Sequence, residues 1–218
     1  MRHQILRSNA QFNDETDLIN LVEEEGFQEW LLIKATNDGL TLYNREANDQ
    51  PFDWSETDQQ IKVSVQQFCS TVHTWIIEAF NEIFQSKPEY RSLELDHFDV
   101  NFLPYIDASD HEPAPYTFDH WHRDSYKEGV FMHFTIGTSQ CFTEVIPVNV
   151  QANEAEEVDG EWLFHERINS QVSNGQLEKQ EVPHGYAIAL TMKDVEMIHR
   201  RGAIQTNGSR IAVRVYFK

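Results

Sequence analysis

Two potential metal ligands stand two residues apart near the middle of the chain, in the segment His-Trp-His-Arg-Asp at positions 120–124. Residues two apart on a β-strand point to the same side, so His122 and Asp124 could reach one metal ion from one strand end. A second histidine from elsewhere would complete a face of two imidazoles and one carboxylate, which leaves positions of a transition-metal ion open to ligands. The tripeptide alone is common, and its simplest interpretation is a hydrogen-bonded pair on a strand.

A second group of polar residues lies near the C-terminus. The run Pro-His-Gly-Tyr at 183–186 is a turn ahead of an apolar strand, and His199 follows at a distance from Asp124 that leaves room for several strands. Arg210 then opens the basic final strand. A guanidinium can pair with two oxygens of a carboxylate at once, so an inward-pointing Arg210 is a natural partner for a dicarboxylate.

The order of these features resembles the superfamily of iron(II)- and 2-oxoglutarate-dependent dioxygenases. The shared pattern runs from a strand and His-x-Asp, through several strands, to a histidine, an arginine and a final strand, and it covers roughly residues 95–218. The resemblance implies a double-stranded β-helix, or jelly-roll, core in which His122, Asp124 and His199 hold iron(II). It also implies that Arg210 binds the far carboxylate of the cosubstrate 2-oxoglutarate.

The same resemblance implies an activity and a further cosubstrate contact. The protein would hydroxylate a C–H bond of a small molecule or an amino-acid residue and release succinate and carbon dioxide. Tyr105 would touch the cosubstrate from the strand before the motif. Many members of the superfamily carry a serine two residues after the arginine, where this chain has Ala212. Arg214 shares the strand parity of Arg210, so either arginine could point inward, and spacing favours Arg210.

Two other classes of protein compete with this interpretation. His120 has the parity of His122, and a cupin could use both as metal ligands, although the cupin glutamate would have to be Glu128, which stands later than usual. Otherwise, we expect His120 to line the substrate pocket. The second alternative is a non-catalytic jelly-roll binding domain. Three further histidines are expected to be surface or strand-packing residues: His133, His165 and His184.

The first ninety residues are expected to form a helical and hairpin layer. A short helix would start at an Asn13 or Asp14 cap and end at Gly26. Segments 27–35 and 40–44 flank Asn-Asp-Gly at 37–39 and predict a hairpin. Apolar residues at helical spacing within 55–86 predict one long helix or two shorter ones.

From Leu93 onward, short segments rich in Val, Ile and Phe alternate with turn residues, which predicts antiparallel strands. One of these expected strands is 162–168. The predicted class is therefore α+β, mainly β. We expect one oxygenase domain over 1–218, with 1–90 as a support region packed outside a jelly-roll core at 91–218.

The charge balance bears on partners. The chain has 17 Lys and Arg residues against 36 Asp and Glu residues, for a formal net charge of −19. Nucleic acids and anionic membrane surfaces both attract basic faces, so we expect neither as a partner. The two cysteines, Cys69 and Cys141, indicate no disulfide framework or zinc motif, and the first fifteen residues lack the apolar run of a signal peptide. These features favour a cytoplasmic protein.

Overall fold

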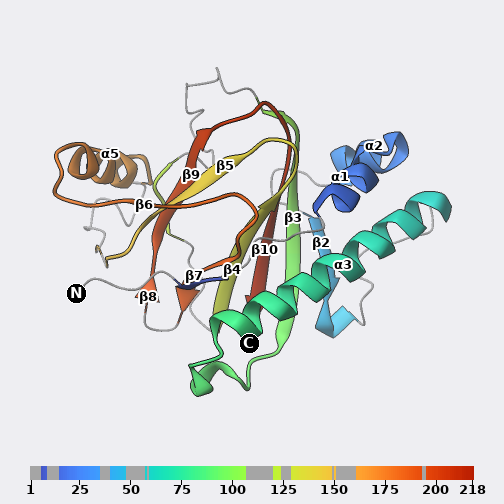
Figure 1. Ribbon diagram of the computed structural model, residues 1–218, viewed down its shortest axis with the longest axis horizontal. Helices are drawn as coiled ribbons and strands as arrows, with labels where there is room; N and C mark the ends of the chain where they lie inside the picture. The colour runs from blue at the N-terminus through green and yellow to red at the C-terminus, as the bar shows by residue number, and fades with distance from the viewer. Residues whose placement is uncertain are drawn as a thin grey trace.

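The structure is a computed structural model that describes most of the chain. The described residues are 6–8, 15–34, 40–47, 57, 59–106, 120–123, 129–148, 150, 161–192 and 195–218. Asp124, one of the three predicted metal ligands, lies outside them. Two antiparallel β-sheets form the centre of the described molecule, with helices packed against them (Figure 1).

The larger sheet places the C-terminal strand near its centre. Its order is β1 (Leu6–Arg7), β7 (Ile188–Met192), β4 (Val130–Ile136), β10 (Gly208–Phe217), β3 (Leu95–Ile106) and β2 (Leu40–Asn44), with β8 (Val195–Glu196) paired to β7. All of these pairings are antiparallel. Because β10 is hydrogen-bonded to β3 and to β4, its side chains are held in fixed register from both sides.

The smaller sheet has the order β6 (Gln180–Val182), β5 (Cys141–Ile146) and β9 (Ile198–Ile204), again antiparallel. His122 forms an isolated antiparallel bridge to His199. The segment around His122 therefore extends this sheet on the far side of β9.

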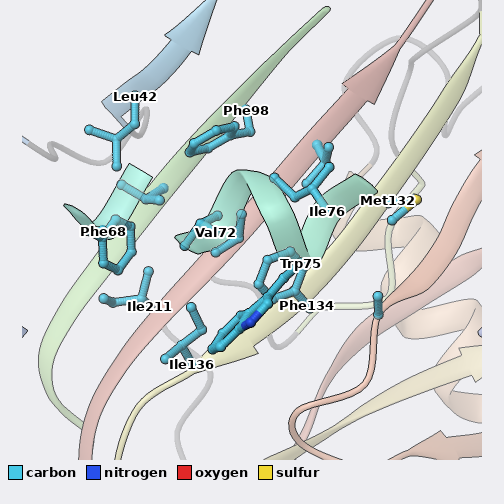
Figure 2. Close-up of a cluster of buried hydrophobic side chains, with 14 of the residues drawn as sticks. Leu42, Phe68, Val72, Trp75, Ile76, Phe98, Met132, Phe134, Ile136 and Ile211 are labelled. Atoms are coloured by element: carbon cyan, nitrogen blue, oxygen red, sulfur yellow. The ribbon is translucent and has the colours of Figure 1, made fainter. Parts of the chain in front are cut away.

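Helix α3 (Gln59–Ile83) covers the outer face of the larger sheet. Its apolar residues recur three and four positions apart, which gives the helix one buried stripe. Figure 2 shows Val72, Trp75 and Ile76 of this stripe close to side chains of the sheet that include Phe98 and Phe134. The long helix predicted from the sequence is thus confirmed.

The remaining N-terminal elements share this core. They are α1 (Glu15–Glu23), α2 (Glu25–Lys34) and the 3-10 turns η1 (Arg45–Ala47) and η2 (Pro88–Tyr90). Leu18, Phe27 and Leu31 from the two short helices are buried in one cluster with α3 and the larger sheet. The described N-terminal helices are therefore packed on the larger sheet.

A separate helix, α5 (Glu161–Ser173), packs against the smaller sheet. Its residues Phe164 and Ile168 are buried with Ile146 of β5, Ile198 of β9 and Trp121. The space between the sheets is filled in part by a third cluster, which includes Phe131, Val145, Ile188, Leu190 and Met197. Each sheet therefore has one face toward the other sheet and one toward a helix.

The structure confirms the predicted α+β class with mainly antiparallel strands, but two predicted strands are wrong. Segment 27–35 lies largely in α2, where Phe27, Trp30 and Leu31 are buried at helical spacing. Segment 162–168 lies in α5, where Phe164 and Ile168 are four residues apart on one buried face. In both segments a short apolar run is compatible with a strand, whereas the spacing of the buried residues is that of a helix.

One smaller prediction differs from the structure, and others lie outside the described residues. Gly26 was expected to end the first helix, but it lies inside α2. The expected caps Asn13 and Asp14 and the expected turn at 37–39 lie outside the described residues. Among the described helices, none combines the length and apolar character that crossing a bilayer requires.

Candidate functional site

His122 and His199 lie side by side at the edge of the smaller sheet. Each main-chain N–H donates to the other residue's carbonyl oxygen, at 3.0 Å in both directions. Residues paired in this way project their side chains to the same side, and the two ring centroids are 4.2 Å apart at an interplanar angle of 58°. The structure thus brings together two of the three predicted ligands from positions far apart in the chain.

Backbone carbonyls orient both imidazole rings. His122 Nδ1 lies 2.7 Å from the carbonyl oxygen of His120, and His199 Nδ1 lies 3.2 Å from that of Met197. A carbonyl oxygen can only accept, so each Nδ1 carries the proton and donates. A neutral ring of this tautomer has its lone pair on Nε2, which is the arrangement found in histidines that bind metal ions.

The third predicted ligand, Asp124, follows one residue after the described segment 120–123. Among the described residues, no group of three His, Cys, Asp or Glu side chains could hold a metal ion. The role of Asp124 therefore stays a prediction.

A pocket opens between the two sheets beside these histidines. His199 and Thr143 line it from the smaller sheet, and Arg210 and Arg214 line it from β10 of the larger sheet. Arg210 is only 3% exposed. Arg214 is less buried, and its Nη2 lies 3.5 Å from Oδ2 of Asp99 on the neighbouring strand β3. Both arginines line the pocket, where their shared strand parity had left either one as the candidate, and the more deeply buried one is Arg210.

His133 is a pocket residue that the sequence did not indicate. It was expected at the surface or in strand packing, but it lines the pocket from β4, directly across from Arg214 in the strand register. Burial, and then the charge of Arg210, hold the pKa of His133 well below its ordinary value, so the ring is neutral. Its Nδ1 is buried and forms no hydrogen bond with the described part of the chain. The sequence did offer one sign of this position, since His133 is a polar residue flanked by the apolar residues Met132 and Phe134.

Two residues predicted for the site do not line this pocket. Tyr105 is 61% exposed near the end of β3, and Asn207 Nδ2 donates to its hydroxyl oxygen at 3.1 Å. His120 is buried against α5, with its ring centroid 5.0 Å from that of Trp162 and 4.5 Å from that of His165. His120 and His122 therefore face different surroundings, α5 and the pocket, although the residues are two apart in the chain.

The contacts with α5 hold the segment that carries His122. The main-chain N–H of Trp121 donates to Nδ1 of His165 at 2.9 Å. Burial, followed by the charge of His120, lowers the pKa of His165 to about 4, which keeps this acceptor unprotonated near neutral pH. On the same side, the Arg200 guanidinium lies 4.4 Å from the centre of the Trp121 ring, and its Nε donates to Glu144 Oε2 at 2.6 Å.

Comparison with known proteins gives the following result. No family model matches the chain, and no curated protein matches it. Solved structures that it resembles are those of the Kdo hydroxylase KdoO, a non-heme Fe(II) alphaketoglutarate-dependent dioxygenase. The complex with succinate and Fe(III) has a TM-score of 0.43 at 10% identity, and the apo form has a TM-score of 0.45 at 11% identity. Each alignment covers 95% of this chain and 85% of the hydroxylase chain. The complex with alphaketoglutarate and Fe(III) has a TM-score of 0.43 at 10% identity and covers 100% and 88%.

Proposed function

We propose that the protein is an iron(II)- and 2-oxoglutarate-dependent oxygenase that hydroxylates a C–H bond of a small molecule or an amino-acid residue. One observation carries the proposal. The pocket between the sheets holds His122 and His199, with ring centroids 4.2 Å apart, together with the buried guanidinium of Arg210. Two imidazoles whose Nδ1 atoms donate to backbone carbonyls, beside a buried guanidinium, suit a transition metal and a carboxylate ligand in one cavity.

The residues of the pocket fit this metal and cosubstrate. His122 and His199 would offer Nε2 to iron(II), and Asp124 would add the carboxylate. Arg210 would pair with the far carboxylate of 2-oxoglutarate, since a guanidinium that is 3% exposed is stabilised by an anion beside it. Arg214 is a less suitable partner because its side chain is 24% exposed and so less buried than that of Arg210. A bound cosubstrate would also bring polar atoms to the buried Nδ1 of His133.

When bound together, iron(II) and 2-oxoglutarate supply dioxygen activation coupled to oxidative decarboxylation, with succinate and carbon dioxide as products. The chain's own residues orient the metal ligands and exclude water from the pocket. Backbone carbonyls fix both ligand rings, and His133, held neutral, adds no charge to the pocket wall. Apolar residues between the sheets, including Phe131 and Val145, keep water from the inner end.

We also propose that the two sheets form a jelly-roll core within a single domain. Successive strands move from sheet to sheet: β3 and β4 lie in the larger sheet with the His122 segment of the smaller sheet between them. The chain then passes to β5 and β6 in the smaller sheet, and later to β7, β9 and β10 on alternating sides. Winding between two antiparallel sheets in this manner is typical of jelly rolls. The N-terminal support region shares a core with the larger sheet, which supports one domain over 1–218.

The two alternatives fit less well. A cupin-type site would need His120 as a ligand, but its ring packs against Trp162 and His165 on α5. A non-catalytic domain would have no use for the oriented pair of imidazoles beside Arg210.

Succinate formation tests the proposal. Protein supplied with iron(II), 2-oxoglutarate and dioxygen should form succinate slowly without any prime substrate. Asp124→Ala and His199→Ala should abolish it, whereas Arg91→Gln, a change at an exposed residue that donates to the carbonyl of Gln85, should not. Absence of succinate together with absence of metal-dependent 2-oxoglutarate binding contradicts the proposal. Metal binding that needs His120 and not His199 favours the cupin.

A further inference from the structure

Arg200 and Trp121 are in contact behind the pair of candidate ligands. Arg200 comes directly after His199 on β9, and Trp121 comes directly before His122. Trp121 is buried among side chains of α5 and the smaller sheet, whereas both histidines line the pocket. The guanidinium carbon of Arg200 lies 4.4 Å from the centre of the Trp121 ring. The neighbours of the two ligands are therefore joined to each other on the side of the sheet that faces α5.

The Trp121 ring depends on this contact because it has no polar anchor of its own among the described residues. It is 1% exposed, and its Nε1 is buried and forms no hydrogen bond with the described part of the chain. Phe164 and Ile168 of α5 belong to the same apolar cluster. Tryptophan is the best aromatic partner for a cation, and the attraction increases when water is excluded. The ring is therefore held by apolar packing and by the guanidinium over its face.

Arg200 is itself fixed from two sides. Its Nε donates to Glu144 Oε2 at 2.6 Å, and its Nη1 donates to Asn169 Oδ1 of α5 at 3.5 Å. Glu144 is the cross-strand partner of Arg200 on β5, is 4% exposed and also forms an ion pair with Lys179. Although Arg200 also lines part of the pocket, its guanidinium is thus anchored to a buried carboxylate and to α5. A planar group held in this way keeps one face on Trp121.

The charge of Arg200 and its position have opposite effects on a metal ion. A divalent cation bound to His199 is repelled by a guanidinium on the next residue, although Glu144 offsets part of that charge. The position of Arg200 acts in the other direction. The segment of His122 joins β9 at one bridge, so a contact that holds Trp121 also holds the His122 ring beside the His199 ring. The sign of the effect on metal affinity therefore separates the two influences.

We propose, resting on the function proposed above, that Arg200 is a positioning residue of the metal centre, which acts through Trp121 and is anchored by Glu144. Its guanidinium ties the residue beside one imidazole ligand to the residue beside the other. The two rings therefore keep their relative position in the metal-free protein. A site that is ordered in advance binds more tightly, because less conformational freedom is lost when the ligand binds.

The test measures the Mn(II) affinity of the full chain by calorimetric titration. Arg200→Met keeps the apolar stem and removes the guanidinium, and it should weaken Mn(II) binding about tenfold, as expected for the loss of a largely buried cation–π contact. Glu144→Gln weakens the anchor of Arg200 and should also lower the affinity. If charge alone mattered, Arg200→Met would raise the affinity and Glu144→Gln would lower it, and that result would overturn the inference. Lys179→Gln is the matched control, because it removes an equal charge from the same carboxylate without touching Trp121, and it should leave the affinity unchanged.

A spectroscopic measurement separates positioning from a general loss of stability. Co(II) replaces iron(II) as a probe, since its visible absorption bands depend on the geometry of its ligands. Arg200→Met should change these bands, whereas Lys179→Gln should keep the wild-type spectrum even where thermal unfolding shows an equal loss of stability. Arg200→Lys keeps the charge and part of the contact with Trp121. It should recover part of the lost Mn(II) affinity and shift the Co(II) spectrum toward that of the wild type.

Metal binding by the wild-type protein separates this inference from the function on which it rests. Equal Mn(II) affinity and the same Co(II) spectrum in the wild type and Arg200→Met overturn the role of Arg200 alone. If Arg200→Met does not fold, Arg200→Lys is compared directly with the wild type, and an unchanged affinity together with an unchanged spectrum overturns that role. Wild-type protein that binds neither Mn(II) nor Co(II) overturns the proposed function.

Discussion

His122 and His199 exchange two main-chain hydrogen bonds of 3.0 Å, which sets their imidazole rings 4.2 Å apart. The pairing joins the short segment 120–123 to β9 at this one bridge. The geometry of the proposed metal centre therefore depends on whatever else holds that segment in place.

Helix α5 supplies that support through His165, whose Nδ1 accepts from the main-chain N–H of Trp121. His165→Leu should leave this buried N–H without its acceptor and cost about 1–3 kcal/mol of folding free energy. It should also weaken Mn(II) binding, because the His122 segment loses an anchor. His165→Asn keeps an acceptor oxygen near the position of Nδ1 and should restore metal affinity. Chemical denaturation and Mn(II) titration measure the two effects, and equal metal affinity in the leucine and asparagine variants would contradict the role given to this bond.

The same residue predicts a pH dependence of stability. The pKa of His165 is lowered from 6.5 to about 4 in the folded protein, so the unfolded chain takes up the proton first as the pH falls. The stability that neutral His165 contributes is therefore complete above pH 6.5 and decreases as the pH falls toward 4. Wild-type protein should lose on the order of 1 kcal/mol more than His165→Asn over this window. Urea denaturation at pH 7 and pH 5 measures the difference, and parallel losses in the two proteins would show that His165 does not titrate in this way.

Arg210 and Arg214 should differ in their effect on cosubstrate binding. Arg210→Gln removes the buried partner of the far carboxylate and should weaken 2-oxoglutarate binding about tenfold to a hundredfold, because charge-assisted hydrogen bonds are lost. Arg214→Gln should have a smaller effect, since Arg214 is less buried than Arg210. Calorimetric titration of Mn(II)-loaded protein gives both affinities. A larger loss at Arg214 would reverse the assignment.

Gly137 fixes the start of the strand that carries Arg210. Its φ is +140°, and a Cβ there would lie 2.3 Å from the carbonyl oxygen of Ser209 and 3.0 Å from Cα of Arg210. Gly137→Ala should push the two strands apart, destabilise the fold and weaken 2-oxoglutarate binding more than Mn(II) binding. Gly175→Ala is a matched control, because its φ is +70° and a Cβ would meet nothing within 4 Å. It should cost only the local strain of about 1–2 kcal/mol and leave cosubstrate affinity unchanged.

The elements that the sequence predicted correctly have strong periodicity. The apolar stripe of α3 and the alternation along β10, where Arg210 and Arg214 face inward, were both readable because burial is one-sided. The segments of α2 and α5 resemble strands in the sequence because each contains a short apolar run, which fits both structures until its tertiary partner is known. The position of His120 could not be derived from strand parity, since the segment is held by α5 and by a single bridge.

The sequence predicts only part of the inner wall of the pocket, again because the tertiary neighbours of a residue are not known from the sequence. His199 and Arg210 were found from their order along the chain, but His133 and Arg201 become pocket residues only when the two sheets face each other. His133 is a polar residue among apolar neighbours, and Arg201 stands two residues after a predicted ligand. Either pattern indicates a pocket residue only once the neighbouring strands are known. Tyr105 was assigned from its place before the motif, and the structure leaves it exposed near the end of β3.

The most direct measurement is anaerobic calorimetric titration of 2-oxoglutarate into the protein with and without iron(II). One molecule of 2-oxoglutarate should bind per chain in the presence of iron(II), and binding should be much weaker in metal-free protein and in Asp124→Ala. Binding that is unchanged by removal of the metal, or no binding with iron(II) present, would contradict an iron(II) centre built on His122, Asp124 and His199.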